Sequence, residues 1–157
     1  MPILSLLLAA ALVAADQLLK LLVLRYLLPV GSVTLIPHFL SLRYLENRGA
    51  AFGILQNRQW VIAAITSIIC VFIVYAIFHY RAKSRLLRVS FTLILGGGVG
   101  NIIDRFARGY VVDYIHFHFF PFIFNFADIC VVVGVALLIL SLFLEDKPEE
   151  GAKESNA

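Results

Sequence analysis

The fold of this chain is decided by one stretch near its start, ILSLLLAAALVAADQLLKLLVLRYLL, residues 3–28. Its charged side chains are few, and Asp16, Lys20 and Arg25 stand among residues that are almost all apolar. About 20 apolar residues are enough for a helix to cross the hydrocarbon core of a bilayer, and a helix satisfies its own backbone hydrogen bonds there. The stretch therefore predicts a first transmembrane helix from Ile3 to Leu28.

The first helix has one feature of a secretory signal peptide, because Ala14 and Ala15 resemble the small residues before a cleavage site. A signal peptide also needs a basic flank before its apolar run, and this stretch lacks one. The apolar pattern moreover continues past Asp16 for the length of a full span. We therefore expect the first helix to remain uncleaved.

Three further stretches are long and apolar enough to span a bilayer, namely residues 60–80, 86–104 and 124–144. The composition agrees, since 61% of the 157 residues are hydrophobic, well above the roughly half of a soluble domain. We predict an all-α membrane protein in which four transmembrane helices form a single membrane-embedded domain, residues 1–144. The polar stretch 145–157 is expected to be a disordered cytosolic tail.

The long connection from Pro29 to Gln59 is too polar to be another span. Within it, Leu40–Tyr44 alternates apolar and polar residues, which is typical of a strand with one wet face. Pro37 and Gly49 punctuate the connection on either side of this stretch. We predict a small extracytoplasmic β-sheet between helices 1 and 2.

Basic residues set the expected orientation in the membrane. Arg81, Lys83, Arg85 and Arg88 lie in the short loop between the second and third spans, which contains no acidic residue. Short loops rich in Lys and Arg tend to stay in the cytoplasm, so we expect both termini there as well. The outer connections also carry arginines, less densely spaced, at Arg43, Arg48, Arg58, Arg105 and Arg108.

With this orientation, polar residues from every outer-facing part of the chain fall at one depth near the outer leaflet. Ionisable groups in a span cost about 2.5–3.5 kcal/mol each on insertion scales, so a cluster of them indicates a functional site. The residues concerned are Asp16 and Lys20 in the first span, Asn101, Asp104 and Arg105 in the third, Asn125 and Asp128 in the fourth, and Asn47 and Asp113 in the outer connections.

Two of the carboxylates in this layer have a cation one helical turn away. Asp16 and Lys20 are spaced i, i+4, and so are Asp104 and Arg108 if the third helix continues that far. For these two acids a structural ion pair is the favoured interpretation.

Asp113 and Asp128 have no lysine or arginine three or four positions away, so they are the catalytic candidates. Two carboxylates held close together do not both ionise easily, and the pair shares a proton near neutral pH. One member then activates water while the other donates a proton, as in aspartic proteases. The helix dipole favours Asp128 as the more acidic member, because it lies in the first turn of the fourth span.

Other ligand classes are less favoured. The formal charge of +3 is too small and too scattered for a nucleic-acid partner. Cys70 and Cys130 form no metal-type motif, HExxH is absent, and His116 and His118 stand among aromatic residues typical of an interfacial belt. The glycines of Gly96–Gly100 match no phosphate-loop pattern and are more typical of close helix packing. We expect no cofactor and no metal.

Five motifs in this order resemble the lipoprotein signal peptidases, the signal peptidase II family. They are DQLLK at residues 16–20, NRGAAFGI at 47–54, GGGVGNIIDR at 96–105, VVDY at 111–114 and FNFAD at 124–128. Each motif alone is weak evidence, but together they cover the whole predicted membrane region without a departure in the motif residues.

The resemblance implies an intramembrane aspartic endopeptidase of the bacterial cytoplasmic (inner) membrane. Its substrate is a prolipoprotein whose cysteine carries diacylglycerol, it cuts the signal peptide just before that cysteine, and the cyclic peptide globomycin inhibits it. The roles implied by the family are a catalytic dyad at Asp113 and Asp128, contacts to substrate or dyad from Asn47, Asn101, Arg105 and Asn125, and support of the site by Asp16 and Lys20.

Two other functions fit parts of the pattern. Acids inside a membrane also build proton relays, so a small proton-coupled carrier is the main alternative. A carrier is expected to place its acids near the midplane between repeated halves, and no repeat is visible. The second alternative is an assembly protein that docks a partner helix on the glycines of the third span.

Overall fold

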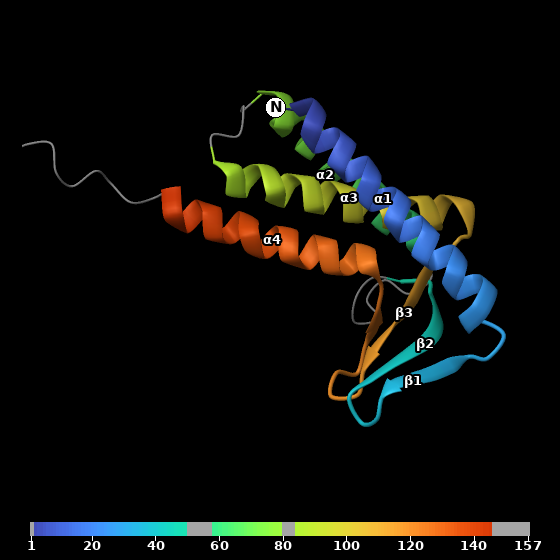
Figure 1. Ribbon diagram of the computed structural model, residues 1–157. Coiled ribbons are helices and arrows are strands. Elements are labelled where there is room, and N and C mark those ends of the chain that lie inside the picture. Colours follow the sequence, from blue (N-terminus) through green and yellow to red (C-terminus); the bar gives the residue numbers. More distant parts are fainter. Residues whose placement is uncertain (1, 50–57, 80–83, 146–157) are drawn as a thin grey trace, which may run out of the picture.

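Four long helices form a bundle with a small sheet at one end (Figure 1). The structure is a computed structural model, and it describes residues 2–49, 58–79 and 84–145. The helices are α1 (Pro2–Leu22), continued by one π-helical turn η1 (Val23–Leu27), α2 (Gln59–His79), α3 (Arg85–Ala107) and α4 (Phe126–Glu145). All four are long and apolar enough to cross a membrane, which confirms the four predicted spans.

Parts of three predictions lie outside the described residues. They are residues 146–157 of the predicted tail, residues 80–83 at the basic loop, and residues 50–57 of the long connection.

Helix α3 is the centre of the bundle because its glycines allow three neighbours to approach closely. A Cβ atom on Gly97 would lie 2.3 Å from the backbone oxygen of Ala127 in α4, so only glycine fits there. The glycine before it faces Leu12 of α1, and the glycine after it faces Cys70 of α2. Successive positions of one glycine run therefore contact three different helices, as the packing interpretation of this run predicted.

The predicted sheet between α1 and α2 is confirmed, but it also takes strands from the connection between α3 and α4. Its four antiparallel strands are β1 (Ser32–Ile36), β2 (Leu40–Asn47), β3 (Val111–Phe117) and β4 (Ile123–Phe124), in the order β1-β2-β3-β4. Strand β3 was not foreseen because its first four residues are all buried, so it shows no alternation of apolar and polar residues. Strand β4 has only two residues, too few to show any period.

The sheet is joined to the bundle by an apolar core under the end of α1. Val23 and Leu27 of η1 are buried against Val112 and Tyr114 of β3. Val112 is fully buried, and the register pairs Glu46 of β2 with it. The first half of β3 is thereby held beneath the helix ends, where it carries Asp113 into the bundle.

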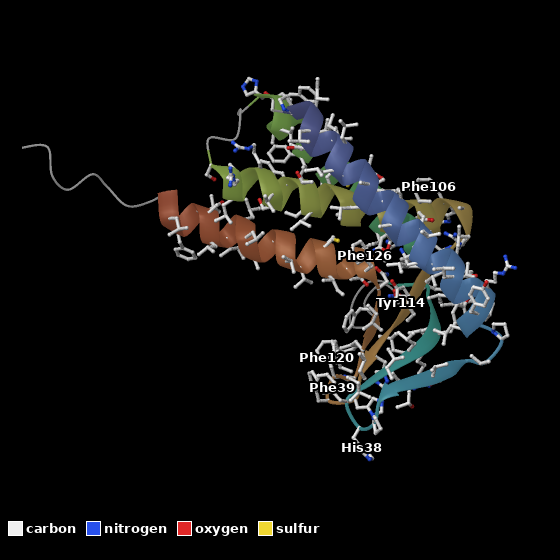
Figure 2. All side chains as sticks on the ribbon, viewed as in Figure 1. His38, Phe39, Phe106, Tyr114, Phe120 and Phe126 are labelled. Atoms are coloured by element: carbon white, nitrogen blue, oxygen red, sulfur yellow. The ribbon has the colours of Figure 1, made fainter. Side chains whose placement is uncertain are left out.

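The far end of the sheet carries a group of aromatic side chains, which we call the aromatic tip: Phe39, Phe117, Phe119, Phe120 and Phe124 (Figure 2). The rings of Phe39 and Phe117 meet edge to face with centroids 5.4 Å apart. Phe119 is 72% exposed, so the tip is not buried by the rest of the chain. Of the aromatic residues expected in an interfacial belt, Phe117, Phe119 and Phe120 lie in this tip, whereas Tyr114 is buried against η1.

Candidate active site

The first turn of α4 holds Asp128 in a reciprocal capping arrangement. The side-chain oxygen of Asn125 accepts a hydrogen bond from the Asp128 backbone N–H at 2.9 Å. The Asp128 carboxylate in turn accepts the backbone N–H of Asn125 at 3.1 Å. This is the geometry of a capping box, in which residues three positions apart satisfy each other's free donors at a helix start. The local sequence Asn-Phe-Ala-Asp therefore fixes the direction of the Asp128 side chain.

Asp113, which lies on β3 of the sheet, is hydrogen-bonded to the residue that precedes α4. It is 1% exposed, and each of its oxygens accepts a hydrogen bond from an asparagine, Asn47 at 2.9 Å and Asn125 at 2.7 Å. Asn47 lies at the end of β2, next to β3 in the sheet. One side chain, Asn125, thus bonds to the Asp113 carboxyl and also caps the turn that carries Asp128. The two catalytic candidates are brought together by a shared asparagine.

Both candidates are held by amides instead of cations. Asn101 donates to Asp128 at 2.7 Å. Within the described part of the chain, no lysine or arginine forms an ion pair with Asp113 or Asp128. An amide donor favours the ionised carboxylate less strongly than a paired cation does, so this arrangement leaves the protonation state of the pair free to change.

Burial raises the pKa of Asp113 to about 7, and the negative charge of Asp128 adds to the rise. The hydrogen bonds from Asn47 and Asn125 and the charge of Lys20 act in the opposite direction and lower it. The Asp113 carboxyl therefore exchanges between its protonated and ionised forms near neutral pH. This is the behaviour needed of a group that both donates and accepts a proton.

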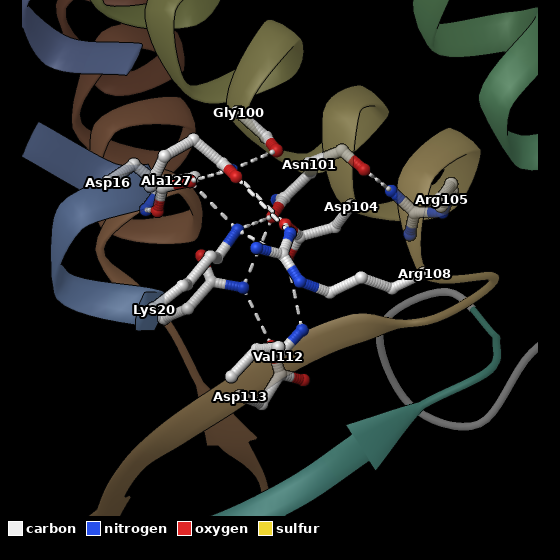
Figure 3. Close-up of polar contacts among 12 residues, drawn as sticks. Asp16, Lys20, Gly100, Asn101, Asp104, Arg105, Arg108, Val112, Asp113 and Ala127 are labelled. Atoms are coloured by element: carbon white, nitrogen blue, oxygen red, sulfur yellow. Dashed lines mark hydrogen bonds and ion pairs between the residues drawn. The ribbon is translucent and has the colours of Figure 1, made fainter. Parts of the chain in front are cut away.

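Beside this pair lies an ionic cluster centred on Lys20, which is fully buried (Figure 3). Its ammonium contacts Asp16 at 2.8 Å and Asp104 at 2.9 Å, and it donates to the side-chain oxygen of Asn101 at 2.9 Å. Three acceptors match the three protons of the ammonium. Asp104 also pairs with Arg108 at 2.5 Å, so both predicted i, i+4 ion pairs are confirmed.

The two acids of the cluster also bond to the backbone next to each catalytic candidate. Asp104 accepts the backbone N–H of Val112, the residue before Asp113, at 3.1 Å. Asp16 accepts the backbone N–H of Ala127, the residue before Asp128, at 3.1 Å. Figure 3 shows both residues at the edge of the cluster. The ionic cluster therefore positions the strand and the helix that carry the pair.

Gln17 belongs to the same cluster, although the sequence did not single it out. Its side-chain nitrogen donates to the Gly100 carbonyl and to Asp104, each at 3.1 Å, and its oxygen accepts from Arg108 at 3.2 Å. The one indication of this role in the sequence is that Gln17 lies inside the motif DQLLK, directly after Asp16.

Arg105 is buried beside the pair but forms no ion pair among the described residues. Its guanidinium donates to the backbone oxygens of Asn101 at 3.2 Å and Gly49 at 3.3 Å. Its charge is close enough to interact with Asp113 and Asp128. It is thus a fixed positive charge next to the two carboxyls.

The two histidines of β3 and its following turn lie apart from this network. The His118 ring nitrogen bonds to the Ser41 hydroxyl at 2.6 Å, and the rings of His116 and His118 have centroids 5.3 Å apart. Among the described residues, no three His, Cys, Asp or Glu side chains gather in a way that suits a metal ion.

An apolar four-helix bundle with a sheet at one end and two carboxyls bonded to the same asparagine is typical of one class, the multi-pass membrane enzymes. A solved structure described as a bacterial membrane enzyme is similar to this chain with a TM-score of 0.83 and 34% identity, over 98% of this chain and 93% of the other. A second one with the same description is similar with a TM-score of 0.76 and 35% identity, over 91% and 94%.

The family model described as signal peptidase (SPase) II matches residues 8–144. The lipoprotein signal peptidase of Caldanaerobacter subterraneus subsp. tengcongensis is 44% identical over 85% of this chain and 92% of that protein. The one from Symbiobacterium thermophilum is 43% identical over 92% and 97%. The chain belongs to the signal peptidase II family of aspartic peptidases, and its activity is that of a lipoprotein signal peptidase. This result decides against the carrier and the assembly protein.

We predict that Asp104→Asn lowers the stability of the protein more than it lowers the turnover of each folded molecule. The substitution leaves Lys20 and Arg108 short of a buried carboxylate, and breaking a buried ion pair costs about 3–5 kcal/mol. Thermal unfolding in detergent should show a large fall in midpoint, with turnover per folded molecule reduced less. The control is Glu46→Gln, which breaks the exposed pair with Arg48 and should change neither quantity. A variant with an unchanged midpoint and no turnover would refute the structural role.

Proposed function

We propose that Asp113 and Asp128 are the catalytic dyad of this peptidase. The observation that carries the proposal is that the buried Asp113 and the half-buried Asp128 are bonded through the same Asn125, and neither has an ion-pair partner among the described residues. Every other buried carboxylate of the cluster is neutralised by Lys20 or Arg108. Only the amide-bound pair is left with a proton to exchange.

The proposed reaction begins with Asp128 ionised and Asp113 protonated. Asp128 takes a proton from water while the water oxygen bonds to the scissile carbonyl carbon, and Asp113 gives its proton to the carbonyl oxygen. Asp113 then removes a proton from the tetrahedral intermediate as the carbonyl re-forms. The carbon–nitrogen bond breaks, Asp128 delivers its proton to the leaving nitrogen, and both carboxyls return to their starting states.

The assignment of the two roles rests on their surroundings. Asp128 accepts two hydrogen bonds and lies at the positive end of the α4 dipole, and both favour its anion. Asp113 is raised to a pKa of about 7, first by burial and then by the charge of Asp128. We therefore assign the shared proton to Asp113 in the resting enzyme.

Of the four neighbouring polar residues, the three asparagines hold the dyad, and Arg105 is assigned to the substrate. The side-chain amide nitrogens of Asn47, Asn101 and Asn125 already donate to the two carboxyls. The Nε atom of Arg105 is buried and has no hydrogen-bond partner among the described residues. A substrate backbone carbonyl is the acceptor that suits it. Globomycin is a cyclic peptide, and we propose that it occupies the substrate position next to Arg105. A cleavage assay that measures whether globomycin competes with substrate would test this.

We also propose that the sheet end faces outward from the bacterial cytoplasmic membrane and that both termini are cytoplasmic. The aromatic tip and the ring pair of Trp60 and Phe106, with centroids 5.5 Å apart, put aromatic side chains at the sheet end, as at a membrane interface. Arg85 and Arg88 lie at the opposite end of the bundle, which suits the cytoplasmic side.

This orientation predicts the outcome of reporter fusions. Reporters placed at residues 81–88 or at the tail should read cytoplasmic, and those placed near Gly31 or Arg108 should read external. An external reading at the basic loop, with Gly31 reading cytoplasmic, would invert the proposed topology and move the dyad to the inner leaflet.

Replacing either dyad residue by asparagine should abolish cleavage of a lipidated precursor while the protein stays folded. Asp113→Asn and Asp128→Asn keep the volume and remove only the titratable group, so a loss of at least about 100-fold in turnover is expected. The unfolding midpoint should be retained, unlike that of Asp104→Asn. Near wild-type turnover of Asp128→Asn would show that the dyad is wrongly assigned.

The substrate is proposed to be a prolipoprotein whose cysteine carries diacylglycerol, cut just before that cysteine. A signal peptide enters the bilayer as a helix with its amides already bonded, so the scissile bond must be unwound before water attacks it. At the outer interface the freed amides find water or protein partners. Two acyl chains in the bilayer anchor the cysteine at the same depth, since each buried CH₂ contributes about 0.8 kcal/mol. The lipid thereby holds the bond beside Asp113 and Asp128.

This anchoring predicts that a precursor with an unmodified cysteine binds poorly and is cut slowly or not at all. Turnover of lipidated and unlipidated precursors with identical peptides should be measured in the same detergent. Equal rates would exclude the anchoring role of the lipid and leave the aspartic chemistry of the dyad untouched.

A further inference from the structure

At the end of the bundle opposite the sheet, a groove lies between α1 and α3. The two helices touch where Gly96 meets Leu12 and the Ala9 carbonyl, and from this contact they separate toward their N-termini (Figure 1). The space between them measures about 740 Å³. Hollows of about 300–1,000 Å³ are the usual size for binding a small molecule, so the groove is large enough for a ligand.

The walls of the groove are apolar and face the surroundings of the bundle. They are formed chiefly by Leu4, Leu8 and Leu12 of α1 and by Val89 and Leu93 of α3. Leu4 and Leu8 are each about half exposed, so they are not covered by another part of the described chain. In a protein that spans a membrane, apolar walls of this kind contact hydrocarbon. An acyl chain is the ligand that fits them.

The groove also has a positive end, formed by Arg85 and Arg88 in the first turn of α3. Their i, i+3 spacing places them on neighbouring positions of the helix surface. Ser84 caps this helix, and its first turn contains no acid. The start of a helix carries partial positive charge, and arginine binds phosphate oxygens with two parallel hydrogen bonds. Among the described residues, no acidic side chain lines the groove.

We propose that this groove binds one anionic glycerophospholipid from the bilayer leaflet at the Arg85 end. One acyl chain lies between α1 and α3, and the phosphate contacts Arg85 and Arg88. The charge at the groove decides for this occupant over a signal peptide, because signal peptides begin with a basic segment that two arginines repel. The site is separate from the dyad, which lies at the other end of α3.

The bound lipid is expected to strengthen the packing of α1 against α3. Between Gly96 and the helix starts, Leu6 of α1 packs against the apolar core shared with α2 and α3, and on the groove side an acyl chain adds packing between α1 and α3. The same α1 carries Asp16 and Lys20 into the ionic cluster. Lipid binding is therefore expected to stabilise the folded bundle as a whole.

The test uses the full chain, purified in detergent with endogenous lipid removed. Phosphatidylglycerol and phosphatidylcholine with the same acyl chains are titrated separately, and the bound lipid is measured by native mass spectrometry and by thermal unfolding. Phosphatidylglycerol should bind with one-to-one stoichiometry and raise the midpoint by on the order of 5 °C near saturation. Phosphatidylcholine should bind more weakly and raise it less.

Two pairs of variants locate the site. Arg85→Gln with Arg88→Gln should weaken phosphatidylglycerol binding about 30-fold, since each arginine near a lipid headgroup contributes about 1 kcal/mol. The charge-matched control, Arg25→Gln with Arg43→Gln, changes two arginines away from the groove and should bind normally. Ala11→Trp fills the groove and should abolish binding, whereas Ala10→Trp, on a neighbouring residue that does not line it, should not.

Three results would overturn the proposal. Equal affinity for the two lipids would exclude recognition of the anionic headgroup. Normal phosphatidylglycerol binding by the Arg85 and Arg88 double variant would exclude the positive end, and normal binding by Ala11→Trp would place the lipid elsewhere. If the double arginine variant fails to fold, the comparison of Ala11→Trp with Ala10→Trp still decides whether the groove is the site.

Discussion

The burial of one charge, the ammonium of Lys20, sets the geometry of the half of the molecule that adjoins the sheet. A buried ammonium inside a membrane bundle is tolerated only when each of its protons has a partner. Asp16 on α1 and Asp104 and Asn101 on α3 provide the three acceptors. Because these come from two helices, the charge fixes the position of α1 along α3. The same two acids also accept backbone N–H groups, Asp104 from Val112 of β3 and Asp16 from Ala127 of α4.

In this arrangement the four acids have two different roles. Asp16 and Asp104 are paired with cations and bond to backbone N–H groups, so they act as fixed acceptors. Asp113 and Asp128 are bonded to amides, which hold them in place without neutralising them, as the proposed dyad requires. Neutralising the first two acids is what allows the other pair to be placed so close to them. Without Lys20 and Arg108, four carboxylates would compete for protons in one buried space.

The sequence was sufficient for features that depend on local spacing. Spans follow from apolar length, and the ion pairs of Asp16 and Asp104 follow from i, i+4 spacing. Asp113 and Asp128 stand out because no lysine or arginine is one turn away in sequence, and their catalytic role stays a prediction. Features that depend on contacts between distant segments could not be predicted from the sequence. Strand β3 is buried along its first half by η1, so its residues do not alternate, and its pairing with β2 joins segments far apart in the chain. The bonds from the acids to Val112 and Ala127 involve backbone groups, which carry no residue signature.

The glycines of α3 connect helix packing with the site. A Cβ atom on Gly100 would lie 2.6 Å from the Asp16 carboxylate, and one on Gly97 would lie 2.3 Å from the Ala127 carbonyl. Any side chain at either position would push α1 or α4 away from α3. Asp16 of α1 bonds across to the Ala127 N–H of α4 at 3.1 Å, a contact that survives only while both helices stay close. Since Ala127 directly precedes Asp128, the absence of two methyl groups in α3 sets the position of a proposed catalytic carboxyl on another helix.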